Sequence, residues 1–224
     1  MNSLTMKIGS EVDVSIDVGK TVEGIGLVPV VVIDDAADAV PTALALKAGG
    51  VPIMEITLRT AAGLDAIEAV SKEVSDVLLG AGTVLSLDKA IGAVERGAKY
   101  IVSPGFDEKI VAWCIEKGVA IFPGCVTPTE ITAAINMGLN VVKFFPANVY
   151  GGIGAIKALS GPFPDIRFMP TGGVDLNNLK DFLIPQVIAV GGGWLCSRKD
   201  IKEKNFDAIT EICKKSVEVV KAGA

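Results

Sequence analysis

The sequence predicts an α/β protein that folds as a single (β/α)8 (TIM) barrel with a short N-terminal extension. Apolar runs rich in β-branched residues recur along the 224 residues at intervals of 20–26 residues, the length of one strand and its helix in such a barrel. Several runs are apolar without alternation, as expected for a parallel sheet covered by helices. A doubly wound open sheet is the alternative, but no Gly-x-Gly-x-x-Gly fingerprint follows the first run.

Eight runs are expected to be strands, and the segments between them carry helix start and stop signals. The strands are expected to begin near Leu27, Val51, Val77, Lys99, Val119, Asn140, Ile166 and Val187. The clearest helix start is Thr127-Pro128-Thr129-Glu130, where Thr is the N-cap, Pro takes the first helical position and Glu completes a capping box. Expected helix ends share a glycine, which tolerates a left-handed turn. These glycines are Gly49, Gly50, Gly97, Gly118 and Gly138.

Composition sets the domain organisation and excludes several partners. A hydrophobic content of 50% supports one large core, so we expect a helical N-terminal extension over residues 1–24 and one barrel domain over 25–224. The net charge of −5 without a basic face argues against nucleic acid as a partner. The mean hydropathy is +0.51, but each apolar run falls short of the roughly 18 residues that a membrane span requires. Four unpatterned cysteines and no signal-peptide pattern predict a cytoplasmic protein whose thiols are core residues.

The absence of histidine narrows the chemistry. With no histidine in the chain, a Ser-His-Asp triad, imidazole acid–base catalysis and histidine metal ligands are all excluded. The acidic residues and cysteines show no metal-ligand spacing, so we expect no metal site. Lysine and carboxylate side chains are left to carry any catalysis.

Lys143 is the most informative residue, because it interrupts the apolar run 140–146 that is predicted to be a buried strand. Burial disfavours the charged ammonium, and a neutral lysine amine can attack a carbonyl group. The alternative is a strand-end lysine whose stem lies on apolar surface while its head reaches water.

Other chemically useful residues also stand where predicted strands end, the edge that carries the chemistry in such barrels. Period two puts Glu55 on one face of its strand with Val51 and Ile53, and Lys143 on one face with Val141 and Phe145. If those faces point inward, Glu55 and Lys143 share the barrel mouth. Arg59 follows Glu55 closely. Taken singly, Glu55 could be a solvated carboxylate and Arg59 a partner in a surface ion pair.

Two glycine-rich loops are expected after the seventh and eighth strands, in the runs 170–175 and 190–194. Barrels bind phosphate at these two strand ends, because glycine lets backbone N–H groups approach an anion and a nearby helix start adds its positive dipole end. Tight turns alone would explain one such loop, but two at adjacent strands favour a phosphate site.

These motifs resemble the 2-keto-3-deoxy-6-phosphogluconate (KDPG) aldolases, including the bifunctional forms that also cleave 4-hydroxy-2-oxoglutarate (KHG). The matching runs lie in order from about residue 28 to residue 194. They are Glu55-Ile56-Thr57-Leu58-Arg59-Thr60, Gly80-Ala81-Gly82-Thr83-Val84, Ser103-Pro104-Gly105, Lys143-Phe144-Phe145-Pro146-Ala147, Gly161-Pro162-Phe163 and Pro170-Thr171-Gly172-Gly173.

The resemblance implies a class I lyase on a (β/α)8 barrel, a homotrimer that needs no cofactor and acts on a phosphorylated keto acid. It implies that Lys143 forms the Schiff base, Glu55 is the general acid and base, and Arg59 holds the substrate carboxylate. Thr83, Pro104 and Phe145 would shape the pyruvate pocket. The phosphate end would be formed by Thr171, Gly172, Gly173, Gly192 and Gly193.

The sequence departs from the family at Gly193, where members often carry serine, so one hydroxyl donor to phosphate is missing. Cleavage of KDPG to pyruvate and glyceraldehyde 3-phosphate is the expected reaction, with KHG cleavage to pyruvate and glyoxylate beside it. Two alternatives stay open: a sugar-phosphate isomerase or epimerase on the same barrel, and a non-catalytic sugar-phosphate binding protein.

Overall fold

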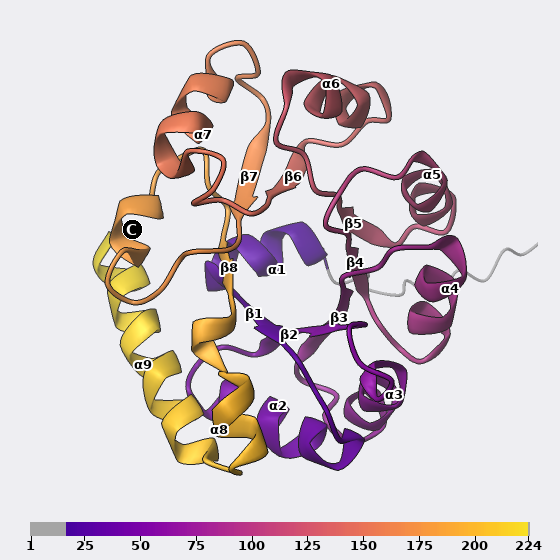
Figure 1. The fold of residues 1–224 in the computed structure, drawn as a ribbon, viewed down its shortest axis with the longest axis vertical. Coiled ribbons are helices and arrows are strands. Elements are labelled where there is room, and N and C mark those ends of the chain that lie inside the picture. The colour runs from indigo at the N-terminus through magenta and orange to yellow at the C-terminus, as the bar shows by residue number, and fades with distance from the viewer. Residues whose placement is uncertain (1–16, 224) are drawn as a thin grey trace, which may run out of the picture.

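The computed structural model describes residues 17–223 and has an α/β fold whose parallel sheet curls into a barrel-like arrangement (Figure 1). The eight strands within these residues coincide with the eight predicted runs. They are β1 (Leu27–Val31), β2 (Ile53–Thr57), β3 (Leu78–Gly82), β4 (Tyr100–Val102), β5 (Ala120–Phe122), β6 (Val141–Phe144), β7 (Arg167–Pro170) and β8 (Val190–Gly192).

The sheet is parallel, but its hydrogen-bonded ladder is not continuous around the barrel. Six strands pair in the order β5-β4-β3-β2-β1-β8, and β6 and β7 form a separate pair. Single bridges join the two groups, from Gly124 to Lys143 on one side and from Thr171 to Gly191 on the other. The expectation of a fully closed eight-stranded sheet is therefore met only in part. Short strands explain the gaps, since β5 and β8 have three residues each and Pro123 has no N–H to extend the ladder.

Helices surround the sheet on the outside (Figure 1). They are α2 (Ala39–Ala48), α3 (Gly63–Glu73), α4 (Leu87–Glu95), α5 (Glu108–Glu116), α6 (Pro128–Asn136), α7 (Gly152–Ser160), α8 (Arg198–Lys202) and α9 (Phe206–Gly223), with the 3-10 turns η1 (Ala36–Asp38), η2 (Leu179–Phe182) and η3 (Gly193–Leu195). The prediction of an α-helix between β7 and β8 is wrong, because only the 3-10 turn η2 forms there. The long helix α9 packs against η2 and α2 and covers this side instead.

The local signals read from the sequence explain where the helices begin and end. In α6, Thr127 and Glu130 form the capping box and Pro128 is the first helical residue. Gly138 follows this helix with a φ of 82°, in the left-handed region that glycine tolerates.

Helix α1 (Val18–Ile25) lies across the amino-terminal ends of the strands, behind the sheet in Figure 1. Its Glu23 accepts a hydrogen bond of 2.9 Å from Arg167 at the start of β7. The predicted boundary at residue 24 thus falls inside the last turn of α1, and residues 1–16 of the predicted extension lie outside the described residues. The division into extension and barrel stays a prediction.

The core is apolar and contains the cysteines, as expected. All four thiols are free and buried, and burial raises the pKa of Cys114 to about 12. Among the helices of residues 17–223, none is long and apolar enough to cross a membrane.

Candidate active site

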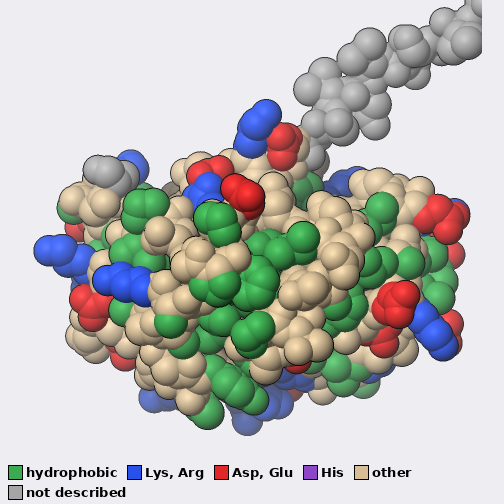
Figure 2. Space-filling model, turned by 90° about the horizontal axis from the view of Figure 1, so that it is seen from above, with side chains coloured by type: hydrophobic (Ala, Val, Ile, Leu, Met, Phe, Trp, Pro, Cys, Tyr) green, Lys and Arg blue, Asp and Glu red, His purple; other side chains and the backbone are tan. Residues whose placement is uncertain are grey.

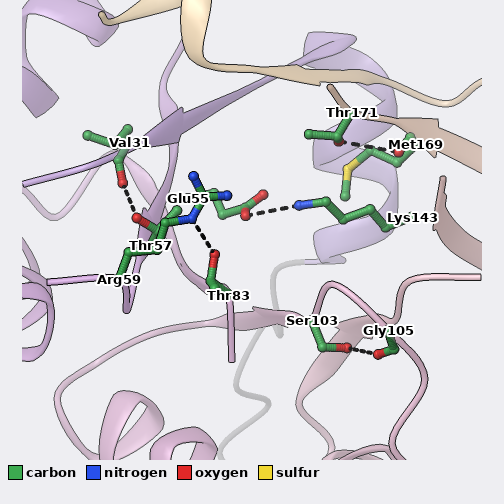
Figure 3. A network of polar contacts seen from close by, with 10 residues as sticks. All are labelled: Val31, Glu55, Thr57, Arg59, Thr83, Ser103, Gly105, Lys143, Met169 and Thr171. Carbon is green, nitrogen blue, oxygen red and sulfur yellow. Dashed lines mark hydrogen bonds and ion pairs between the residues drawn. The ribbon is translucent and has the colours of Figure 1, made fainter. Parts of the chain in front are cut away.

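Lys143 and Glu55 face each other across the inside of the sheet, near the carboxyl ends of β6 and β2 (Figure 3). The Lys143 Nζ donates to the Glu55 Oε1 at 3.2 Å, and the two residues are 5% and 0% exposed. The predicted inward orientation of both side chains is therefore confirmed. A buried ion pair is poor support for stability, because desolvation of the two charges offsets most of their attraction. Such a pair between strands 88 residues apart points to chemistry instead.

Two glycines on β3 make room for the large side chains inside the sheet. A side chain at Gly82 would collide with the Glu55 carboxylate, and one at Gly80 would collide with the ring of Tyr100. The missing side chain at Gly82 therefore leaves the space in which the Glu55 carboxylate lies.

Arg59 is oriented by Thr83 (Figure 3). The Arg59 Nε donates to the Thr83 Oγ1 at 3.1 Å, which joins the end of β2 to the end of β3. Thr83 has a φ of 54°, a left-handed conformation that a β-branched residue rarely adopts. Strain of this kind persists where the surrounding structure requires it, often at a functional site.

Phe145 connects the lysine with the phosphate-side loops. Its ring centroid lies 5.5 Å from the Lys143 Nζ, within the range of a cation–π contact. The same ring lines a cavity of about 310 Å³ together with most of the predicted substrate-binding residues. The cavity is lined by Val30, Val32, Arg59, Phe145, Thr171, Gly172, Gly173, Val174, Gly192, Gly193, Cys196 and Arg198.

The first glycine-rich run forms a loop as expected, and the second does not. Gly172 and Gly173 have φ values of 95° and 78° in the turn after β7. Asn148, which was not among the predicted site residues, packs directly against Gly173 and donates its backbone N–H to the Gly172 carbonyl at 3.1 Å. By contrast, Gly191 and Gly192 belong to β8, because they pair with β1, and the chain leaves the sheet only at Gly193.

Pro104 and Thr83 are the two predicted substrate-binding residues that do not line this cavity. Thr83 is tied to it through Arg59. Pro104 lies between Ser103 and Gly105, whose hydroxyl and carbonyl are joined by a hydrogen bond of 2.7 Å below Lys143 in Figure 3. Its carbonyl occupies the space that a side chain at Gly124, two residues after β5, would need.

Sequence reasoning missed Arg198, the second arginine of the cavity. It is the first residue of α8, and its Nε and Nη2 donate to the Asp34 carboxylate at 2.7 and 2.6 Å. The available signal was its position, the first basic residue after the second glycine-rich run. Its partner is 164 residues away in the sequence, which hid the pair.

The described residues offer no obvious place for a metal ion. Between residues 17 and 223, no group of three or more cysteine, aspartate and glutamate side chains is arranged to hold one.

The fold and site together define a class: an α/β barrel-like protein with a buried lysine–carboxylate pair at the carboxyl ends of its strands. The sequence model "KDPG and KHG aldolase" matches residues 18–212, and the chain belongs to this aldolase family. The resemblance drawn from the motifs is thereby confirmed.

Relatives and a solved structure match over most of their length. The 2-dehydro-3-deoxy-phosphogluconate aldolase of Treponema pallidum is 42% identical, over 92% of this chain and 98% of that protein. The KHG/KDPG aldolase of Escherichia coli is 40% identical over 87% of this chain and 92% of its own. The crystal structure of KDPG aldolase from Legionella pneumophila, with pyruvate captured as a covalent carbinolamine, has a TM-score of 0.85 and 38% identity, covering 88% of this chain and 96% of that one.

Proposed function

We propose that the protein is a class I aldolase that cleaves KDPG to pyruvate and glyceraldehyde 3-phosphate, and KHG to pyruvate and glyoxylate. The observation that carries this proposal is the buried Lys143–Glu55 pair in a chain of the KDPG and KHG aldolase family. The isomerase and non-catalytic alternatives lose their support, because relatives at 40–42% identity over most of the chain are named aldolases.

Catalysis begins with a proton transfer inside the pair. The Lys143 Nζ passes a proton to Glu55 across the 3.2 Å contact and becomes a neutral amine. The amine attacks the 2-keto carbon of the substrate to give a carbinolamine. Glu55 then protonates the departing hydroxyl, which leaves as water, and an iminium ion is formed.

The iminium ion is the electron sink for carbon–carbon cleavage. Glu55, again a carboxylate, takes the proton of the C4 hydroxyl, and the C3–C4 bond breaks. The bonding electrons move to the iminium nitrogen and leave an enamine on Lys143, while the aldehyde departs. Protonation of the enamine carbon and hydrolysis of the imine release pyruvate and restore the amine.

Arg59 and the glycine-rich segments bind the two ends of the substrate in this proposal. The planar guanidinium of Arg59 suits a carboxylate, and Thr83 fixes its direction through the 3.1 Å hydrogen bond. Thr83, Pro104 and Phe145 shape the pyruvate pocket. The phosphate end lies beside Thr171, Gly172, Gly173, Gly192 and Gly193, which share one cavity with Arg59.

The finer features of assembly belong to the same proposal: a closed (β/α)8 barrel, a homotrimer and a cytoplasmic location. The bridges at Gly124 and Thr171 support closure. Self-association is supported by an apolar face over α6 and α7, where hydrophobic side chains gather between charged groups at the edges (Figure 2). Exposed apolar residues of this part of the chain include Ile135, Val149 and Tyr150. Light scattering on the purified protein reports its mass directly.

Trapping of the covalent intermediate tests the proposed function. Incubation with pyruvate and borohydride is expected to add one reduced pyruvyl group to Lys143, detected by peptide mass spectrometry. Lys143→Met, which keeps a similar apolar volume, is expected to abolish both trapping and cleavage of KDPG and KHG. The control is Lys157→Met, which removes an exposed lysine of α7 and should change neither. An unmodified Lys143 peptide would refute the Schiff-base assignment.

A further inference from the structure

We propose that Arg198 binds the phosphate of the substrate and makes the protein select phosphorylated over unphosphorylated aldehydes and keto acids. This inference rests on the proposed aldolase function and adds a residue to its distal end. It starts from the position of Arg198 in the 310 Å³ cavity, beside Gly172, Gly173 and Gly193.

The charges that line the cavity are both positive. Among the described residues, Arg59 and Arg198 are its charged lining groups, and no carboxylate lines it. Arg59 is attached to the β3 side through Thr83, whereas Arg198 follows β8 at the glycine-rich side. A ligand with one anionic group at each end fits this arrangement, because each arginine can pair with one of them.

Asp34 orients Arg198 but uses only some of its hydrogen-bond donors. The carboxylate accepts from the Nε and Nη2 of the guanidinium, which has five N–H donors, so three donors are left for an anion. Asp34 follows β1 and does not line the cavity. The pair is exposed, at 63% for the arginine and 43% for the aspartate side chain, so sharing or loosening it costs little. Asp34 thereby holds the guanidinium in place before the ligand arrives.

Arg198 also supplies donors that Gly193 lacks. Position 193 has no side chain, so it offers an anion only a backbone N–H. A guanidinium five residues later in the same cavity supplies charge-assisted donors that suit a phosphate dianion better than one hydroxyl does.

The experiment compares two aldehydes that differ only in phosphate. Aldol addition of pyruvate to glyceraldehyde 3-phosphate and to glyceraldehyde is measured, and selectivity is the ratio of the two kcat/KM values. Arg198→Gln is expected to lower this ratio about tenfold or more, mainly through KM for the phosphorylated aldehyde. Arg198→Lys keeps the positive charge but loses the planar, bidentate guanidinium, so its selectivity ratio should lie between those of the unsubstituted protein and Arg198→Gln. Lys199→Gln removes an exposed cation from the same helix, outside the cavity lining, and should leave the ratio unchanged.

Asp34→Asn separates a ligand role from a purely structural pair. If Arg198 only fastens α8 to the end of β1, both partners' variants should reduce selectivity and stability alike. If Arg198 binds phosphate, Asp34→Asn should lower selectivity far less than Arg198→Gln does, because the guanidinium keeps its charge and its donors when its exposed partner is neutralised. Equal losses, or an unchanged ratio in Arg198→Gln and Arg198→Lys, would overturn the inference.

Pyruvate trapping distinguishes this failure from failure of the proposed function. If the unsubstituted protein is not modified by pyruvate and borohydride at Lys143, the aldolase proposal fails. If trapping is normal and the Arg198 variants keep full selectivity, the role of Arg198 alone is refuted.

Discussion

Thr83 holds a left-handed backbone conformation that costs free energy. Its hydroxyl accepts the hydrogen bond that orients Arg59. A β-branched residue in the left-handed region is strained by about 1–3 kcal/mol. Glycine would remove that strain but would also remove the hydroxyl. The site therefore keeps a strained threonine, because an unstrained glycine would leave Arg59 without the hydrogen bond that orients it.

Thr83→Gly is expected to raise the free energy of unfolding by about 1 kcal/mol while weakening carboxylate binding. Because the lost hydrogen bond is solvent-accessible, KM for KDPG should rise about three- to tenfold. Urea unfolding and steady-state kinetics measure the two effects. Thr83→Ala is the control, since it loses the hydroxyl and keeps the strain: KM should rise equally without a gain in stability. An unchanged KM in both variants would show that the hydroxyl does not orient Arg59.

At the scale of elements, the residue that follows β8 tolerates a side chain better than the turn after β7 does, because the backbone conformations differ. Gly172 has a φ of 95°, so any side chain there is strained and a charge placed at that position tests strain as well as repulsion. Gly193 has no such restriction, and a Cβ there would meet only the Val30 carbonyl oxygen, at 3.6 Å. Position 193 is therefore the better place to probe the phosphate end.

Gly193→Ser is expected to lower KM for KDPG and leave KM for KHG unaffected. The added hydroxyl can donate to the phosphate, and one charge-assisted hydrogen bond of about 1.5–3 kcal/mol corresponds to tenfold or more in affinity. Gly193→Ala adds the same Cβ without a donor and should have no such effect. Gly193→Asp should raise KM for KDPG by repulsion. Equal changes on both substrates would show that this residue shapes the barrel end and does not contact phosphate.

For the whole molecule, the spacing of apolar runs and the helix start and stop signals were sufficient to locate the strands and to predict that Glu55 and Lys143 converge. Both are local properties: strand alternation decides which way a side chain points, and the common edge of parallel strands brings the ends together. Non-local pairing escaped prediction. The glycines of β8 become strand through pairing with β1, and Asp34 meets Arg198 only after the strands have assembled. Likewise, α9 replaces the missing helix between β7 and β8 from the far end of the chain.

The Lys143–Glu55 pair links the activity of the molecule to its stability. Both side chains are almost fully buried, at 6% and 1% exposure, so their desolvation opposes folding even while they attract each other. Removing one partner leaves a buried group without its counter-charge. Removing both leaves neutral groups in nearly the same volume.

Lys143→Met alone is therefore expected to fold but to lose about 3–5 kcal/mol of unfolding free energy, and Glu55→Gln alone to lose a similar amount. The double variant Lys143→Met/Glu55→Gln should recover most of this loss while remaining inactive. Urea unfolding of the four proteins gives the coupling energy as a double-mutant cycle. If the losses of unfolding free energy were additive, the two side chains would not interact through their charges. That result would contradict the proton transfer proposed between them. A double variant as stable as the unsubstituted protein would show that the pair is retained for catalysis, because folding proceeds as well without it.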